Sequence, residues 1–376
     1  MIIICYQSGK YHKVLSMNLG RSIAGSRSLT KAAAQYARAL VTGRRIPLYV
    51  GLFITPRCNL KCVYCFPDSP HRKEESEFSR QEIFNIVDEL YRMGTRYIVL
   101  LGGEPLLRED VEDIISHIAR KQIIIEVITN GYFTRQRLPA LRKLSYVCHS
   151  IDGTEADMEK NRGRGSYRKI MESMTLCREN GIPIQMRTVF NKNNAGSLNF
   201  LLNLADSWGT TLGLCEQAVT RETDKNFVMS APELRQFWCT VRDYKKKGYP
   251  VDKTFHLLDN IINFPTDIPL DRIFRNGDPI PPGYHVRPCH IARSHAFIDS
   301  NGMMYPCPML LGRGRYGRSI NGHGGVKGAW DDLAENDCLF CRQSVQDLKN
   351  EFFSYDLQAM TTVAATLFAK LARQPG

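Results

Sequence analysis

The sequence predicts an α/β fold whose parallel sheet is either doubly wound or closed into an incomplete barrel. Between residues 47 and 216, six short β-rich runs alternate with helical segments, a pattern that places helices between parallel strands. Several polar motifs directly follow these runs, where the carboxyl ends of parallel strands bring functional groups together. A cysteine-rich segment from residue 289 onward predicts an additional small module held by ligands.

The expected strands and helices follow from hydrophobic periodicity. The β-rich runs are Leu48–Ile54, Tyr97–Leu101, Ile123–Ile128, Tyr146–Ile151, Pro183–Phe190 and Thr211–Leu214. The helices expected between and after them are Ser79–Met93, Asp110–Lys121, Thr134–Leu144, Tyr167–Asn180, Gly196–Trp208 and Pro232–Lys247.

The composition fits such a fold and excludes several classes of protein. The chain has 376 residues, 43% of them hydrophobic, which is enough for a sizeable core. No apolar run approaches the roughly 18–20 residues of a membrane span, and the first residues lack the features of a secretory signal. We therefore expect a cytoplasmic protein whose 12 cysteines serve as metal ligands or in redox chemistry rather than as disulfides. The net charge of +12 permits an anionic partner without identifying one.

Residues 1–46 are expected to form a basic amphipathic N-terminal segment. Over Leu29–Val41 an apolar stripe at helical spacing faces a basic one. The apolar residues are Leu29, Ala33, Tyr36 and Leu40, and the basic ones are Arg27, Lys31, Arg38 and Arg45. Two interpretations are open: the helix lies on a membrane or grips a partner, or it docks on the main domain with its charges in solvent.

Cys58, Cys62 and Cys65 lie within eight residues, directly after the first expected strand. Three thiolates on one loop can hold three corners of a cubane iron–sulfur cluster and leave the fourth iron open. Zinc is the alternative, but structural zinc prefers four ligands in paired CxxC or CxxH arms, which this spacing does not supply. The spacing therefore favours an iron–sulfur site.

This CxxxCxYC pattern resembles the signature of the radical S-adenosylmethionine (radical SAM) superfamily. Further motifs of that family follow in the expected order, each after one of the next strands. They are Gly102-Gly103-Glu104, Thr129-Asn130-Gly131 and Ser150-Ile151-Asp152-Gly153, followed by Asn161-Arg162-Gly163. The matches cover roughly residues 47–216, and the resemblance implies a partial (β/α)6 TIM-like barrel.

The resemblance also implies the site residues and the chemistry. Cys58, Cys62 and Cys65 would bind a [4Fe–4S] cluster whose open iron chelates S-adenosylmethionine (SAM). The expected SAM contacts are Tyr64, Gly102, Gly103, Glu104, Asn130, Ser150, Asp152 and Arg162. An electron from a donor such as flavodoxin or ferredoxin would cleave SAM, and the 5′-deoxyadenosyl radical would take hydrogen from a substrate carbon.

Two of these expected contacts have alternatives. Glu104 could accept a hydrogen bond from the SAM ammonium group, or it could support the turn in which it lies. Asp152 could belong to the SAM site, or it could cap the helix that follows. Arg162 is the natural partner of the SAM carboxylate, because a guanidinium binds a carboxylate through two parallel hydrogen bonds.

A second set of thiols consists of Cys289, Cys307, Cys338 and Cys341. A predicted hairpin with an Asn-Gly turn, Phe297–Tyr305, would bring the first two together, and the CxxC pair supplies the others. Four thiolates could hold a second, auxiliary [4Fe–4S] cluster or a structural zinc ion. The pattern resembles the SPASM/Twitch extensions of radical SAM enzymes. No cysteine follows Cys341, which favours the single-cluster Twitch form.

The chain is thus predicted to contain five segments. They are the N-terminal segment 1–46, the barrel 47–247, a Pro-, Gly- and Asn-rich linker or loop layer 248–288, the auxiliary cluster domain 289–345, and a C-terminal amphipathic helix 346–376. The remaining cysteines, to which we assign no chemistry, are Cys5, Cys148, Cys177, Cys215 and Cys239.

The sequence leaves the substrate between two classes. A hydrophobic, lipid-like or other small metabolite is favoured by the basic stripe and by the apolar C-terminal helix, which together would allow peripheral membrane contact. A precursor peptide is the alternative, because peptide maturation is the commonest role of SPASM relatives, although few residues precede the barrel for leader binding. A metal-binding interaction protein is the non-enzyme alternative, and no nucleic-acid partner is expected.

Overall fold

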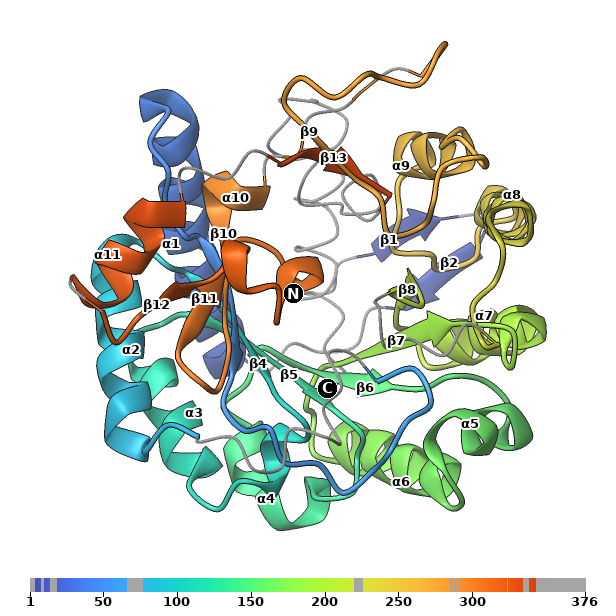
Figure 1. The fold of residues 1–376 in the computed structure, drawn as a ribbon. Helices are drawn as coiled ribbons and strands as arrows, with labels where there is room; N and C mark the ends of the chain where they lie inside the picture. Colours follow the sequence, from blue (N-terminus) through green and yellow to red (C-terminus); the bar gives the residue numbers. More distant parts are fainter. Residues whose placement is uncertain are drawn as a thin grey trace.

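The computed structural model describes residues 4–7, 10–13, 19–65, 77–219, 226–284, 286, 289, 291–322, 324–333 and 338–342. Within these residues, nine strands form one sheet in the order β12-β11-β10-β3-β4-β5-β6-β7-β8. Strands β3 to β8 are all parallel, and helices surround the curved sheet on its outer side (Figure 1). The expected α/β class and partial (β/α)6 barrel are confirmed.

The barrel elements follow the expected order. The strands are β3 Tyr49–Phe53, β4 Tyr97–Leu101, β5 Ile124–Thr129, β6 Tyr146–Ser150, β7 Ile184–Phe190 and β8 Leu212–Glu216. The helices are α2 Arg80–Met93, α3 Val111–Arg120, α4 Thr134–Leu141, α5 Glu155–Arg162, α6 Ser166–Glu179, α7 Leu198–Ser207 and α8 Ala231–Lys246. Helix α5 was not predicted, because its polar sequence EADMEKNR carries no apolar stripe.

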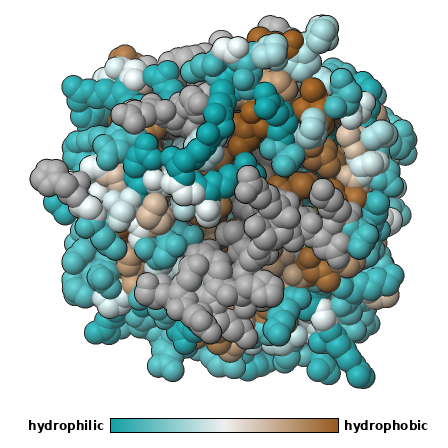
Figure 2. Space-filling model, in the orientation of Figure 1, coloured by the Kyte–Doolittle hydropathy of each residue, from teal (hydrophilic) through white to brown (hydrophobic). Residues whose placement is uncertain are grey.

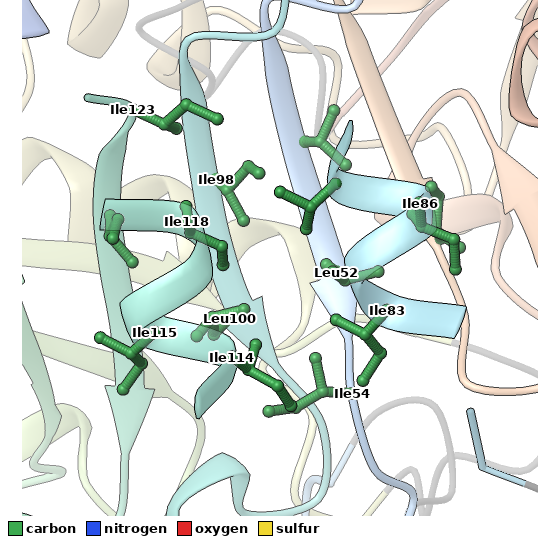
Figure 3. Close-up of a cluster of buried hydrophobic side chains, with 14 of the residues drawn as sticks. Leu52, Ile54, Ile83, Ile86, Ile98, Leu100, Ile114, Ile115, Ile118 and Ile123 are labelled. Atoms are coloured by element: carbon green, nitrogen blue, oxygen red, sulfur yellow. The ribbon is translucent and has the colours of Figure 1, made fainter. Parts of the chain in front are cut away.

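The core lies between the sheet and the outer helices. Side chains alternate along each strand, so Leu52 of β3 and Leu100 of β4 point outward and pack against Ile83 of α2 and Ile114 of α3 (Figure 3). Helix α2 begins at a capping box, in which the Ser79 hydroxyl accepts from the Glu82 N–H and the Glu82 carboxylate accepts from the Ser79 N–H.

The inner face of the sheet carries a second apolar cluster. Tyr49, Tyr97 and Tyr146 begin their strands and belong to it. The hydroxyls of Tyr97 and Tyr146 each donate to Glu126 Oε2 over 2.8 Å. A buried carboxylate needs such donors, and the Arg187 guanidinium lies 3.6 Å from Glu126 Oε1.

Helix α1 (Leu19–Thr42) docks on the barrel. It contacts β5, and Ala32 joins the inner apolar cluster. The buried face includes Ser28, Ala32 and Ala39, whereas Ala33 of the predicted apolar stripe is exposed. Tyr36 of the same stripe is partly buried and packs against the cluster of Ala39, Ile46 and Leu48. The packed face therefore overlaps the predicted stripe only in part, because small residues, which carry little hydrophobic signal, make much of the close contact. The side chains of Leu29 and Leu40 lie outside the described residues.

The predicted hairpin is present as β10 His295–Ile298 and β11 Met303–Tyr305, which pair antiparallel. Strand β10 also pairs parallel with β3, with His295 opposite Tyr49, and β12 Arg318–Ser319 pairs with β11. The hairpin therefore continues the barrel sheet. A local hairpin pattern does not reveal which sheet edge it joins, so this connection could not be predicted.

The interval 248–288, predicted as a linker or loop layer, contains helix α9 Phe255–Ile262 and strand β9 Ile273–Arg275. Leu258 and Ile261 are buried in the core. Strand β9 pairs antiparallel with β13 Cys338–Cys341. The many prolines and glycines around these short elements concealed them.

The other described elements are short. They are β1 Ile4–Gln7, β2 Lys10–Lys13, α10 Ile291–Ser294 and α11 Gly325–Asp332. The predicted C-terminal helix 346–376 lies outside the described residues. Across the part of the chain that is described, no helix is both long and apolar enough to span a membrane. Figure 2 shows a largely hydrophilic rim around the face seen in Figure 1, with hydrophobic residues nearer the middle.

Candidate functional site

The first cysteine loop is held against the turn that follows β4. The Gly103 N–H donates to Thr55 O and the Glu104 N–H donates to Arg57 O, both over 2.8 Å. A Cβ atom on Gly103 would lie 2.2 Å from Arg57 O, and one on Gly102 would lie 2.4 Å from Thr55 O. Both glycines therefore allow close approach, as expected, but the backbone they approach here is that of the cysteine loop.

Cys58, Cys62 and Cys65 lie on this loop, partly buried and outside any disulfide. Burial raises the pKa of the Cys58 thiol to about 11, although a hydrogen bond from the Leu60 N–H offsets part of the effect. Burial also raises the pKa of Cys62. Both thiols are therefore protonated at neutral pH, and binding of a metal cluster would release these protons.

Glu104 is 1% exposed and supports the surrounding loops. Its Oε1 accepts from the Leu106 N–H at 3.1 Å and the Thr129 hydroxyl at 2.8 Å, and its Oε2 accepts from the Asn130 N–H at 2.8 Å. Burial raises the pKa of Glu104 to about 7, against the opposing effect of these hydrogen bonds. Of the two expected roles, this geometry matches support of the turn.

Asp152 is fully buried and pairs with Arg162. Arg162 Nε lies 2.6 Å from Asp152 Oδ2, and Arg162 Nη2 lies 3.2 Å from Oδ1. The Tyr64 hydroxyl donates to Oδ2 over 2.5 Å, and the Arg162 guanidinium lies 5.4 Å from the Tyr64 ring centre. The alternative that Asp152 caps α5 is wrong, because Thr154 is the N-cap residue.

The electrostatics of this group favour the ionised pair. Burial alone would lower the pKa of the Arg162 guanidinium, but the Asp152 carboxylate raises it well above its usual value. Burial raises the pKa of Tyr64 well above its usual value, so its hydroxyl stays protonated and can donate. The Asp152 and Arg162 charges thus compensate each other away from water.

Asn130 and Ser150 lie at the carboxyl ends of neighbouring strands. Asn130 Nδ2 donates to Asn59 Oδ1 over 2.8 Å and lies 3.9 Å from the Cys58 sulfur. It thereby joins the turn after β5 to the cysteine loop. Ser150 is the last residue of β6, half-buried, opposite Arg187 of β7.

Buried asparagines complete the site, and the sequence analysis missed most of them. Asn194 Nδ2 donates to the Asp152 carbonyl over 2.9 Å. Asn191 Nδ2 donates to Asn161 Oδ1 over 3.2 Å, and the Asn161 carbonyl accepts from the Val63 N–H. The available signal was the run Asn-Lys-Asn-Asn directly after β7.

The second set of thiols converges near the inner face of the barrel. Burial raises the pKa of Cys307 well above its usual value, and the nearby thiols Cys341, Cys289 and Cys338 raise it further. Cys307 packs in the inner apolar cluster with Phe53, the last residue of β3. Figure 1 shows the orange segment that follows β11 near the centre of the barrel.

Both thiol sets suit iron–sulfur clusters by their donor chemistry, because clusters of this kind are held by cysteine thiolates. Among the described residues, no group of three or more His, Cys, Asp or Glu side chains is placed to hold a single metal ion. A cubane is held differently, since each thiolate binds its own iron atom. The structure thus gathers the first three thiols with Tyr64, Glu104, Asp152 and Arg162. The four thiols of the second set form a separate group.

A sequence profile of the radical SAM superfamily matches residues 52–205. This interval runs from β3 into α7. It contains the first cysteine loop and the strand-end motifs that surround it.

This chain has relatives among known enzymes, and three of them illustrate the range. Fe-coproporphyrin III synthase of Methanosarcina barkeri is 31% identical over 157 residues, 41% of this chain and 39% of that protein. GTP 3′,8-cyclase of Aquifex aeolicus is 26% identical over 320 residues, 80% of this chain and 94% of that protein. Mycofactocin maturase MftC of Mycobacterium ulcerans is 28% identical over 189 residues, which are 49% of this chain and 51% of that protein. The chain thus spans less than half of the first relative and about half of the third.

Two solved structures share the fold. SuiB of Streptococcus suis, bound to the precursor peptide SuiA, has a TM-score of 0.62 at 18% identity, covering 85% of this chain and 74% of that one. The protein anSMEcpe, bound to AdoMet and the Kp18Cys peptide, has a TM-score of 0.57 at 18% identity, covering 86% and 98%. The profile match shows that residues 52–205 form a radical SAM domain, and the two solved structures show that the chain shares their fold.

Proposed function

We propose that this chain is a radical SAM enzyme in which Cys58, Cys62 and Cys65 hold the [4Fe–4S] cluster that a radical SAM domain implies. The observation that carries the proposal is the gathering of these thiols with Glu104 and the Asp152–Arg162 pair at the carboxyl ends of the strands. When bound, the cluster supplies the electron that cleaves SAM, and so the radical that removes hydrogen from the substrate.

The chain's own residues would bind and orient SAM. The backbone after β4, which the Gly103 and Glu104 N–H groups tie to the cysteine loop, would form one wall, and Ser150 lies at the end of β6. Arg162 would hold the SAM carboxylate while Asp152 and Tyr64 fix the position of its guanidinium. Because Asp152 is fully buried, water is kept from this pair.

The four thiols of the second set would hold an auxiliary [4Fe–4S] cluster. A structural zinc ion is less favoured, because it needs its thiols around one ion and the described residues contain no such group. Four cysteines would fill every iron corner, so the substrate would not bind at iron unless a ligand left. Electron transfer, or support of the substrate space, is therefore the expected role of such a cluster. Its place on the inner face of β3 fits both roles.

For the substrate we propose a peptide. The folds of SuiB and anSMEcpe, which resemble this chain over more than four fifths of its length, were solved with bound peptides, and MftC is also a maturase. A lipid-like substrate is less favoured, because α1 packs on the barrel through Ala32 and Ala39, as the docking interpretation requires.

A small metabolite is the second candidate. A relative that matches over 80% of this chain and 94% of its own length is named GTP 3′,8-cyclase, and another is named Fe-coproporphyrin III synthase, after a product that is not a peptide. The test is 5′-deoxyadenosine formation by the reconstituted enzyme with a low-molecular-weight fraction of a cell extract, before and after protease digestion of that fraction. A peptide substrate loses its stimulation on digestion, whereas a metabolite keeps it.

The radical SAM assignment is tested by changing Cys62 to Ala. Removing one of three thiolates leaves a cluster corner without its ligand, so we expect 5′-deoxyadenosine formation in the anaerobic, reduced enzyme to fall to background. Cys239→Ala, on α8 and assigned no chemistry, is the matched control and should retain wild-type formation. Wild-type turnover by Cys62→Ala would overturn the assignment.

A further inference from the structure

We infer that a buried ion pair between Arg342 and Glu216 positions the Cys338–Cys341 arm and thereby controls assembly of the second thiol site. This inference rests on the proposed function, in which those thiols hold a cluster. Arg342 directly follows Cys341, and Glu216 is the last residue of barrel strand β8. The pair therefore joins the arm to the wall of the barrel.

The geometry of the pair is that of a specific buried contact. Arg342 Nε lies 2.9 Å from Glu216 Oε1, and the two side chains are 2% and 3% exposed. The Trp238 indole N–H donates to Glu216 Oε2 over 3.1 Å, so both carboxylate oxygens accept a hydrogen bond. Arg342 Nη2 is buried and has no hydrogen-bond partner among the described residues, so Glu216 is the main compensation for this charge.

The arm also has an apolar anchor, Phe340, which lies two residues before Arg342. Phe340 is fully buried, and its ring stacks on Phe274 of β9 with centroids 4.3 Å apart. The pairing of β13 with β9 shifts register between Cys338 and Phe340, so strand alternation alone does not orient the two thiols. Contacts of the neighbouring side chains, Phe340 and Arg342, must then fix the arm.

Another ion pair offers a matched control. Arg80 Nη1 lies 2.5 Å from Asp113 Oδ2, between α2 and α3, but these side chains are 57% and 54% exposed. Loss of an exposed pair has little effect. Loss of Arg342, by contrast, leaves the Glu216 charge buried without its partner, which is strongly unfavourable.

The experiment compares Arg342→Met, Glu216→Gln, the double variant, Arg342→Lys and the control Arg80→Met in the full chain. We expect Arg342→Met to bind about four irons after anaerobic reconstitution instead of about eight. In the iron-free chain, alkylation of Cys338 and Cys341 by iodoacetamide, mapped by mass spectrometry, should accelerate about tenfold. Alkylation of Cys58 in the same sample should not change.

Rescue distinguishes positioning from a general loss of structure. The double variant removes both charges, and Arg342→Lys retains the cation, so both should recover part of the bound iron and of the thiol protection. Arg80→Met should behave as wild type. Glu216→Gln gives the same comparison if Arg342→Met does not fold.

The outcomes separate this inference from the function on which it rests. Unchanged alkylation of Cys338 and Cys341 in both single variants would overturn the inference, as would equal acceleration at Cys58. If the wild-type chain binds only about four irons, the proposal of an auxiliary cluster is wrong. The alkylation comparison then still tests whether the Arg342–Glu216 pair positions the arm.

Discussion

At the scale of single residues, the candidate site is organised by buried carboxylates whose hydrogen-bonding capacity is nearly filled. Asp152 accepts from Tyr64 and Arg162, and Glu104 accepts from three donors on the turns after β4 and β5. A buried polar group is costly when unpaired. Each carboxylate therefore holds its loops in one arrangement, before any cofactor binds.

Gly103 offers a test of how closely the cysteine loop must approach the turn after β4. A Cβ atom there would lie 2.2 Å from Arg57 O and 2.8 Å from Cys58 Cβ, so Gly103→Ala must displace the loop. We expect 5′-deoxyadenosine formation to fall about 100-fold with loss of iron from the first site. Gly196→Ala is the control, because its added methyl meets nothing within 4 Å. Retention of wild-type iron and turnover by Gly103→Ala would contradict this account.

His149 gives a pH-dependent prediction. Burial lowers its pKa from 6.5 to about 3, and its Nε2 lies 2.9 Å from Ser173 Oγ. Because the unfolded chain takes up this proton first, the stability contributed by neutral His149 is present above pH 6.5 and is lost as the pH falls towards 3. Between pH 7 and pH 5 this amounts to about 2 kcal/mol.

The measurement is the urea-induced unfolding of the iron-free chain and of His149→Gln at both pH values. Glu104, with a raised pKa, shifts stability in the opposite direction, so the difference between variant and wild type isolates His149. That difference should move in favour of the variant by about 2 kcal/mol at pH 5. His256→Gln on α9 controls for histidine loss, and a constant difference would show that His149 does not titrate in this way.

At the scale of elements, helix α1 shows where periodicity misleads. The sequence indicated a helix and a basic face correctly, since Arg27, Lys31 and Arg38 are exposed. It placed the apolar contact only partly on the correct face. Tyr36 packs against the cluster of Ile46 and Leu48, but Ala33 is exposed, and the side chains that meet the barrel also include Ser28 and Ala32. Small residues permit close packing yet contribute little to a hydrophobic pattern.

Neighbouring alanines on α1 test that orientation. Ala32 is 6% exposed and Ala33 is exposed, and the change to Asp has the same intrinsic cost in a helix at both positions. Ala32→Asp buries an unpaired carboxylate and should lower the free energy of unfolding by about 2–4 kcal/mol. Ala33→Asp should change it by no more than about 0.5 kcal/mol. Equal values in urea unfolding would refute this placement of α1.

Structural features that depend on local sequence patterns were predicted, whereas those that depend on contacts between distant residues were not. The barrel strands and most helices were predicted, since their apolar patterns are local, and the strand-end motifs indicated where site residues meet. The sequence did not predict helices α5 and α9, the pairing of β10 with β3, or the Glu216–Arg342 ion pair. The members of that pair are 126 positions apart, and no local pattern records such a contact.

At the scale of the whole molecule, the second cysteine module and the barrel share one sheet. Strand β10 covers the free edge of β3, and the Phe297 ring lies 2.5 Å from where a Cβ atom on Gly51 would be. Tyr305, Leu310 and Leu311 extend the apolar cluster on the inner face. The predicted segments 47–247 and 289–345 are therefore joined by the backbone hydrogen bonds between β3 and β10.

We expect residues 47–247 alone to aggregate rather than fold as a soluble barrel. Without β10 the edge of β3 presents unpaired backbone groups, and the inner cluster loses its cover. The measurement is size-exclusion chromatography of the shortened chain against the full chain. A monomeric, cooperatively unfolding product from residues 47–247 would show instead that the barrel is an independent domain.

The pairing of β10 with β3 also has a consequence during synthesis. Strand β3 ends at Phe53 and β10 begins at His295, so the ribosome must add 242 residues (295 − 53) before the partner strand exists. At about 5–20 residues per second this takes roughly 12–50 s. Throughout that interval the β3 edge of the nascent barrel has no partner strand, which exposes the emerging chain to edge-to-edge association with other chains.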